Sequence, residues 1–153
     1  MNEQLEQLAR EIDLTGPSFE PLRLAFGYAC AVRVRHLLEE PAVVECLTRL
    51  GDHVNGGIAA GELERYADEA SHLASRHPGS KSIDGCGHAA VSATFAVANA
   101  LAGRAMVAAD YAVYAIVYGE GGYGAVADPS SFEAEHRWQV DTLAALHRGL
   151  QRR

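Results

Sequence analysis

The sequence predicts a single all-α domain, a bundle of about six or seven helices, and three observations lead to this prediction. First, residues 87–118 are mainly alanine and other small apolar residues, with Gly103 as the one strong break. A helix that is apolar on nearly every side is usually buried among other helices, and alanine loses little entropy in one. Second, the flanking segments repeat apolar residues at helical spacing. Third, no stretch shows the sustained two-residue alternation of a strand, so we expect no sheet.

Length and composition fit one globular unit. The chain has 153 residues, of which 48% are hydrophobic and 22% are charged. These values suit a domain with a sizeable core and argue against intrinsic disorder. We expect residues 20–153 to form that domain, with residues 1–19 as an N-terminal helical arm. Stacking of helical hairpins in pairs stays open as the arrangement of the bundle.

The first two helices are expected on either side of a break. Leu5 and Leu8 fall on one side of a short helix over residues 1–11. The run Thr-Gly-Pro-Ser at residues 15–18 ends it. A second helix is predicted over residues 20–40, with a proline in its first turn, where a missing N–H costs nothing.

The next two helices have the clearest periodicity. Residues 42–55 repeat apolar side chains at helical spacing, and residues 61–77 are equally regular. The opposite face of the latter segment is acidic and includes Glu62, Asp68 and Glu69. A charged face of this kind is usually only solvated. The alternative is a docking surface for a cationic protein.

The central pair of helices is predicted over residues 84–101 and 105–118, with Asp84 as the N-cap of the first. Asp110 is the most anomalous charge, because it lies on an otherwise apolar helix and burying a lone carboxylate is costly. We therefore expect Asp110 to be mostly buried beside a stripe of tyrosines and bonded to a base or a hydroxyl. His88 is the second candidate buried polar residue. A pocket acid is the functional alternative for Asp110.

Residues 119–128 are predicted to form a loop before the last helix. Residues 119–124 match G-x-G-x-x-G, but the phosphate-binding version of that motif follows a strand and opens a helix. We therefore interpret the match as a flexible loop. Ser130 and Glu133 have the spacing of a capping box, which predicts the start of the last helix.

The residues that could carry catalysis or hold a metal do not form a known motif. A zinc site needs about four converging ligands. Asp84, Cys86 and His88 are close in sequence, but no metal-ligand spacing accompanies them. No nucleophile elbow or Cys/His signature is present either. We therefore expect no catalytic residue, no metal and no cofactor.

Charge and cysteine usage limit the partners. The formal net charge of −7 disfavours binding to nucleic acid and to anionic membranes, and it is compatible with a basic protein partner. The most apolar run, residues 89–101, is shorter than the roughly 20 residues that span a bilayer. Residues 1–13 do not resemble a signal peptide. Three widely spaced cysteines, Cys30, Cys46 and Cys86, are typical of a protein in the reducing cytoplasm.

The order of features resembles the all-α immunity proteins of bacterial polymorphic-toxin systems, in the group called immunity protein five. The resembling pieces are residues 22–41 (LRLAFGYACAVRVRHLLEEP), 87–116 (GHAAVSATFAVANALAGRAMVAADYAVYAI) and 135–143 (EHRWQVDTL). The most specific points are Glu39-Glu40-Pro41, the Ala-x-x-Tyr-Ala pattern around Tyr111, and Trp138-Gln139. The resemblance implies histidine at the positions of Phe95 and Asn99, where this chain departs from it.

The resemblance implies a cytoplasmic protein that binds and blocks a cognate toxin. We expect a non-enzymatic immunity protein whose partner, for example a basic nuclease domain, contacts the acidic face. The expected contact residues are Glu62, Asp68 and Glu69, with Tyr123 or Trp138 as an aromatic anchor. Two alternatives stay open: a small metal-dependent or acid–base enzyme centred on His88 and Asp110, and a helical adaptor. The sequence leaves the toxin and the oligomeric state open.

Overall fold

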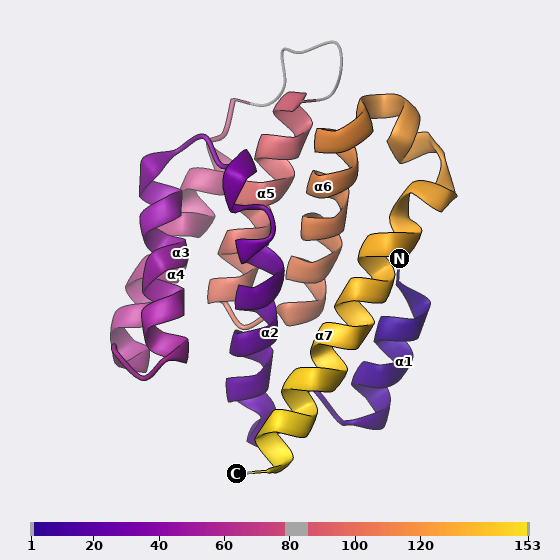
Figure 1. Ribbon diagram of the computed structural model, residues 1–153. Coiled ribbons are helices and arrows are strands. Elements are labelled where there is room, and N and C mark those ends of the chain that lie inside the picture. The colour runs from indigo at the N-terminus through magenta and orange to yellow at the C-terminus, as the bar shows by residue number, and fades with distance from the viewer. Residues whose placement is uncertain (1, 79–85, 153) are drawn as a thin grey trace.

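The computed structural model describes residues 2–78 and 86–152, and these residues form seven α-helices, three short 3-10 helices and no strand (Figure 1). The prediction of an all-α bundle is therefore confirmed. The α-helices are α1 (Glu3–Glu11), α2 (Glu20–Val32), α3 (Pro41–Val54), α4 (Ala60–Ser75), α5 (Cys86–Leu101), α6 (Ala105–Ala127) and α7 (Glu133–Gln151). The 3-10 helices are Pro17–Phe19, Arg35–Leu37 and Pro129–Phe132.

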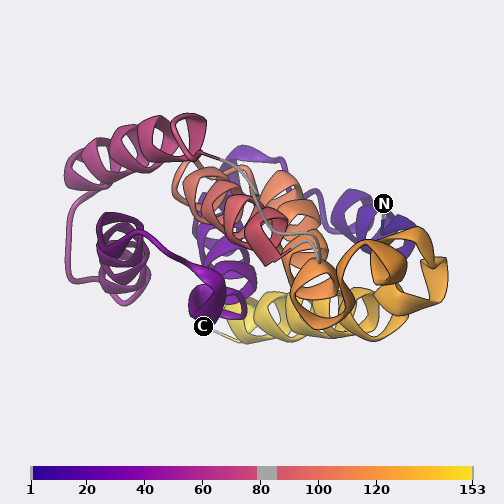
Figure 2. The ribbon, with the colours of Figure 1, turned by 90° about the horizontal axis from the view of Figure 1, so that it is seen from above.

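Helices α5 and α6 form an antiparallel hairpin at the centre of the bundle (Figure 1). Helix α2 packs against both of them. Helices α3 and α4 lie on one side of this centre, and α7 lies on the other side with α1 against it (Figure 2). The two central helices predicted from their composition therefore make the most extensive helix–helix contact of the bundle with each other, and both pack on α2.

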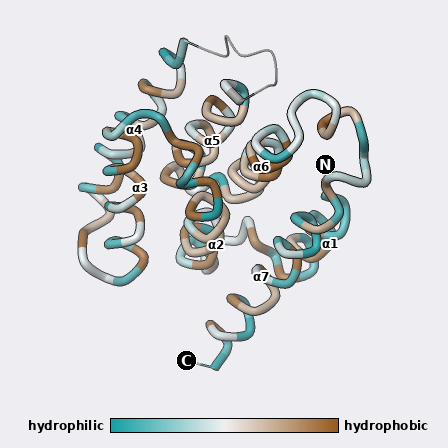
Figure 3. The backbone as a smooth tube through the Cα atoms, turned by 45° about the horizontal axis from the view of Figure 1, so that its top comes forward, coloured by the Kyte–Doolittle hydropathy of each residue, from teal (hydrophilic) through white to brown (hydrophobic). Residues whose placement is uncertain are grey.

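Alanine lets the central helices pack closely. Ala93 and Ala100 of α5 and Ala109 of α6 are completely buried. A Cβ atom placed on Gly27 of α2 would lie only 3.2 Å from the Cα atom of Ala100, so these two backbones nearly touch. In Figure 3, α5 and α6 are mostly pale to brown along their length, whereas α1 is largely teal.

The segment expected to be an N-terminal arm shares the core of the domain. Helix α1 packs on α7. Leu5 and Leu14 are each only 1% exposed, and they belong to one cluster with Phe26 of α2 and Leu143 of α7.

Two helix ends differ from the prediction. Helix α2 ends at Val32 instead of residue 40, and a 3-10 turn follows, in which Val34 is buried and the Leu37 N–H donates to the Val34 carbonyl. This three-residue spacing lets both side chains face the core. Helix α6 continues to Ala127 through the expected loop, with a kink at Gly122 (φ 63°, ψ −151°). Glycine tolerates this non-helical conformation, so the chain bends sharply at Gly122 and resumes the helix directly after it.

The predicted capping box is also wrong. Residues Pro129–Phe132 form a 3-10 helix, and α7 begins only at Glu133. The Asp128 carboxylate caps the 3-10 helix, because it accepts hydrogen bonds from the backbone N–H and the hydroxyl of Ser130 at 3.0 and 2.9 Å. The expected N-cap Asp84 lies outside the described residues.

Candidate protein-binding surfaces

The acidic face predicted on α4 is exposed. Glu62, Asp68 and Glu69 all lie on the solvent side of the helix, and within residues 2–78 and 86–152 none of them makes an ion pair or a hydrogen bond. The opposite side of α4 is anchored by Leu63 and Ala70, which are buried in the core cluster shared with α3 and α5. The rigid packing of one side therefore holds the three carboxylates in water on the other.

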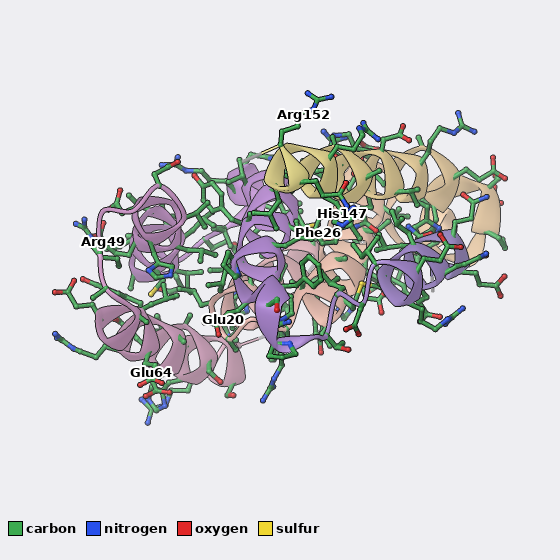
Figure 4. The ribbon with its side chains drawn as sticks, turned by 90° about the horizontal axis from the view of Figure 1, so that it is seen from below. Glu20, Phe26, Arg49, Glu64, His147 and Arg152 are labelled. Carbon is green, nitrogen blue, oxygen red and sulfur yellow. The ribbon has the colours of Figure 1, made fainter. Side chains whose placement is uncertain are left out.

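A groove of about 580 Å³ lies between the start of α2, the first half of α4 and the turn between α5 and α6. Its apolar lining consists of leucine and alanine side chains: Leu24, Leu63, Ala67, Leu101 and Ala102. Three exposed carboxylates line it as well, those of Glu20, Glu64 and Asp68. Figure 4, seen from below, shows Glu20 at the start of α2 and Glu64 on α4. No local pattern in the sequence indicates this groove, since Glu20 and Glu64 are 44 positions apart in the chain.

Among the residues that the structure describes, Arg23 is the one cation that lines this groove, and its guanidinium already has partners. Its Nη1 donates to the carbonyl oxygens of Leu14 and Gly16, at 2.7 and 2.8 Å, in the turn that follows α1. Over the part of the chain that the structure describes, Glu20, Glu64 and Asp68 make no ion pair and no hydrogen bond. The groove therefore offers three carboxylates that have no cationic partner among these residues.

A second surface runs along the outer side of α6. Four large hydrophobic side chains are exposed among the described residues, and three of them belong to α6: Val107 (43%), Tyr114 (39%) and Tyr123 (48%). Tyr111 and Tyr118 lie half-buried on the same side, at helical spacing from Tyr114. We call Val107, Tyr111, Tyr114, Tyr118 and Tyr123 the aromatic face.

Rings from neighbouring elements hold the aromatic face in place. Tyr111 stacks on Phe95 of α5, with ring centroids 5.1 Å apart. Tyr114 meets the edge of Phe132 at 5.3 Å. Edge-to-face and stacked pairs of this kind are favoured arrangements of aromatic rings, so they stabilise Tyr111 and Tyr114 in these positions.

His88 and Tyr123 meet at the upper end of the bundle, close to the kink in α6. The His88 ring lies 5.3 Å from the ring of Tyr118 and 5.4 Å from the ring of Tyr123. The bend at Gly122 lets Tyr123 face back towards α5. His88 is half-buried instead of fully buried, and its surroundings in this cluster are aromatic.

The other expected anchor, Trp138, is less accessible than Tyr123. It is half-buried on α7, and the guanidinium carbon of Arg33 lies 4.1 Å above its ring. Arg33 also makes a two-pronged ion pair with Glu135, in which its Nε donates to Oε2 at 2.9 Å. This ion pair fixes the cation over the indole, so Trp138 serves mainly to join α2 and α7.

Comparison of the chain with known protein families, curated proteins and solved structures found no match. No described helix has the length and apolar character needed to cross a membrane.

The prediction that Asp110 is buried is wrong. The residue is exposed on the outer side of α6, because α6 packs through its alanines on the other sides. Its carboxylate is still partly withdrawn from water, and this desolvation raises its pKa above the ordinary value; Glu6 adds to the rise and His136 opposes it. Among the described residues, Asp110 makes no hydrogen bond or ion pair.

His88 and Asp110 are not neighbours. The ring of His88 lies beside Tyr118, and eight positions of α6 separate Tyr118 from Asp110, which amounts to about 12 Å of helix rise. The arrangement therefore does not bring this pair together as an acid–base centre.

The remaining candidate ligands are also dispersed. No three His, Cys, Asp or Glu residues in the described ranges gather as a metal site would require. Cys30 and Cys46 are buried free thiols, and burial raises the pKa of both, that of Cys46 to about 11. Asp84 and the side chain of Cys86 lie outside the described structure. The G-x-G-x-x-G match falls within the second half of α6 around Gly122, so no strand precedes it and the strand–turn–helix setting of a phosphate loop is missing there.

Proposed function

We propose that this protein is a non-enzymatic binding protein that neutralises a cognate bacterial toxin domain, in the manner of an immunity protein. The observation that carries the proposal is the aromatic face. Protein interfaces draw most of their binding energy from a few side chains, among which tyrosine is enriched. Three large side chains of α6, Val107, Tyr114 and Tyr123, are exposed, so a protein partner can desolvate them.

Charge supports the same proposal. The chain carries a formal net charge of −7, and the acidic residues of α4 are exposed and without ion pairs among the described residues. Such a surface speeds the encounter with a basic partner and makes the association rate fall as salt is added. A toxin with a basic substrate groove, such as a nuclease domain, has the complementary charge. Tyr123 is the preferred anchor, since Trp138 is covered by Arg33.

We place the protein in the cytoplasm, where a neutralising partner would meet a toxin that acts inside the cell. The free and buried thiols of Cys30 and Cys46 suit a reducing compartment.

The test starts from the gene directly upstream of the one for this protein: if that gene encodes a toxin domain, the two proteins are co-expressed. Wild type should protect the cells, and the double variant Tyr114→Ala, Tyr123→Ala should lose at least tenfold in affinity for the purified toxin. The triple variant Glu62→Lys, Asp68→Lys, Glu69→Lys should bind more slowly. A charge-matched control changes exposed acidic residues on α1 and α7: Glu3→Lys, Glu11→Lys and Asp141→Lys.

The outcomes separate the parts of the proposal. If the α4 variant binds as fast as the control variant, the acidic face has no special role. If folded wild type neither binds the toxin nor protects cells, the assignment as the immunity protein for that toxin is wrong.

A further inference from the structure

We propose that the groove between α2, α4 and the α5–α6 turn receives an arginine or lysine side chain of the toxin. This inference deepens the proposed function and rests on it for the identity of the partner. The groove itself, with its apolar lining and its three carboxylates, is a feature of the chain alone.

The shape and the chemistry of the groove match the two parts of a long cationic side chain. Arginine and lysine have apolar stems and charged heads, and they bury the stem along apolar surface while the head stays near water. Leu63, Ala67 and Leu101 supply the apolar lining. Carboxylates at the exposed border can pair with a guanidinium through two parallel hydrogen bonds or with an ammonium as a point charge.

Arg23, the described cation at the groove, does not pair with the three carboxylates. Arg23 lines the groove, but its guanidinium is bound to the carbonyl oxygens of Leu14 and Gly16. The carboxylates of Glu20, Glu64 and Asp68 make no ion pair within the described residues, and the first of them comes from a different helix from the other two. A partner's cation that enters between α2 and α4 thus meets carboxylates from both sides.

A side chain fits this arrangement better than a metal ion does. Metal ions need ligand atoms that converge within roughly 2.0 to 2.6 Å of one point. In the part of the chain that the structure describes, no three acidic, histidine or cysteine side chains come together in this way. The carboxylates border a groove of about 580 Å³ instead of closing on a centre, and a long side chain can contact them separately.

The experiment uses a defined probe in place of the unidentified toxin. The probe is the peptide acetyl-Leu-Arg-Leu-amide, titrated into the ¹⁵N-labelled full chain at low salt and followed by amide chemical shifts. The matched peptide replaces arginine by citrulline, which keeps the shape and removes the charge. We expect saturable shifts at the amides of Leu63, Ala67 and Ala102 with a dissociation constant on the order of 1 mM, and at least tenfold weaker binding of the citrulline peptide.

Variants assign the binding to the groove. The triple variant Glu20→Gln, Glu64→Gln, Asp68→Asn should bind the arginine peptide at least tenfold more weakly. The control Glu62→Gln, Glu69→Gln removes carboxylates from the same helix at positions that do not line the groove, and it should bind within twofold of wild type. All substituted residues are exposed, and circular dichroism establishes that each variant is folded. Glu64→Gln alone replaces the triple variant if that one does not fold.

Three results would overturn the inference: equal binding of the arginine and citrulline peptides, shifts outside the groove, or equal weakening by the control variant. Failure of the proposed function is a separate result. If the arginine peptide binds in the groove while wild type does not bind the toxin, the groove is a cation site and the immunity assignment fails. If wild type protects cells and the groove variant protects them equally, the inference about the toxin is wrong and the proposed function stands.

Discussion

Gln139 joins three helices through one buried amide. Its Nε2 donates to the Ala109 carbonyl of α6 at 2.9 Å, and its Oε1 accepts from Asn2 at 3.3 Å. Asn2 in turn caps α1, since its Oδ1 accepts the Leu5 N–H. Both amides are almost fully buried, where an unpaired polar group is costly.

Replacing this amide should therefore destabilise the fold. Gln139→Ala is expected to lower the free energy of unfolding by about 2 to 4 kcal/mol, because it leaves a cavity and removes a partner from two buried groups. Urea denaturation provides the measurement. Gln7→Ala, at an exposed glutamine that bonds only to Glu11 of its own helix, should stay within about 0.5 kcal/mol of wild type. A loss below about 1 kcal/mol for Gln139→Ala would mean that water replaces the network.

Asp110 should make stability depend on pH. A carboxyl group whose pKa is higher in the folded protein than in the unfolded chain binds protons more tightly when folded. The free energy of unfolding therefore falls as pH rises from the unfolded pKa, about 3.9, through the higher folded pKa. Asp110→Asn removes this effect, so the variant should be the more stable protein at pH 7.

The gain in the free energy of unfolding should be under about 1 kcal/mol at pH 7, because Asp110 is exposed and solvent screens its charge. The gain should vanish as pH falls below about 3.9, where the carboxyl group is protonated in both states. Urea denaturation of wild type and variant at pH 4 and pH 7 measures the difference. Asp141→Asn on α7 makes the same change of charge elsewhere on the surface. A destabilised Asp110→Asn variant at pH 7 would show that the carboxylate supports the fold instead.

The kink in α6 depends on one glycine. At Gly122, φ is 63° and ψ is −151°, a combination that residues with a Cβ atom essentially never adopt. Gly122→Ala should lower the free energy of unfolding by about 1 to 3 kcal/mol. It should also move Tyr123 away from His88, which ring-proton shifts would report.

Gly124 is the matched control, because a Cβ there would meet nothing within 4 Å. Gly124→Ala should therefore be neutral or stabilising by up to about 1 kcal/mol. An undisturbed Tyr123 ring in Gly122→Ala would contradict this role of the kink.

Segments with strong local signals were predictable from the sequence, and segments decided by distant contacts were not. Alanine content marks α5 and α6, and the start of α6 at Ala105 follows from Gly103. The glycines of residues 119–124 also predict a loop by local rules, yet only Gly122 leaves the helical conformation and the residues on either side of it are helical.

The candidate surfaces also divide into those that the local sequence predicts and those that depend on contacts between distant segments. The exposure of Glu62, Asp68 and Glu69 follows from the periodicity of α4. The placement of Asp110 required knowing which side of α6 remains uncovered, and an apolar helix with little asymmetry does not reveal that. The groove required knowing that the start of α2 lies beside α4, which no local pattern encodes.

The whole bundle has two core clusters that share their central helices. The first combines residues of α1, α2, α5, α6 and α7, and the second combines residues of α2, α3, α4, α5 and the start of α6. Because α2, α5 and α6 contribute to both, neither cluster can come apart without exposing part of the other. The molecule should therefore unfold as one cooperative unit, with α1 included.

Matched substitutions in the two clusters test this cooperativity. Leu5 of α1 is 1% exposed in the first cluster, and Leu50 of α3 is completely buried in the second. Leu5→Ala and Leu50→Ala should each lower the free energy of unfolding by about 2 to 5 kcal/mol and shift a single calorimetric transition to lower temperature. Gln4→Ala, exposed on α1, should leave that transition nearly unchanged.

If α1 were an arm that frays independently, Leu5→Ala would lower the free energy of unfolding only slightly, and the α1 amides would exchange with solvent rapidly in wild type. If Leu50→Ala instead split the transition in two, the α3–α4 side would be a separate unit, because the shared helices would then fold without it.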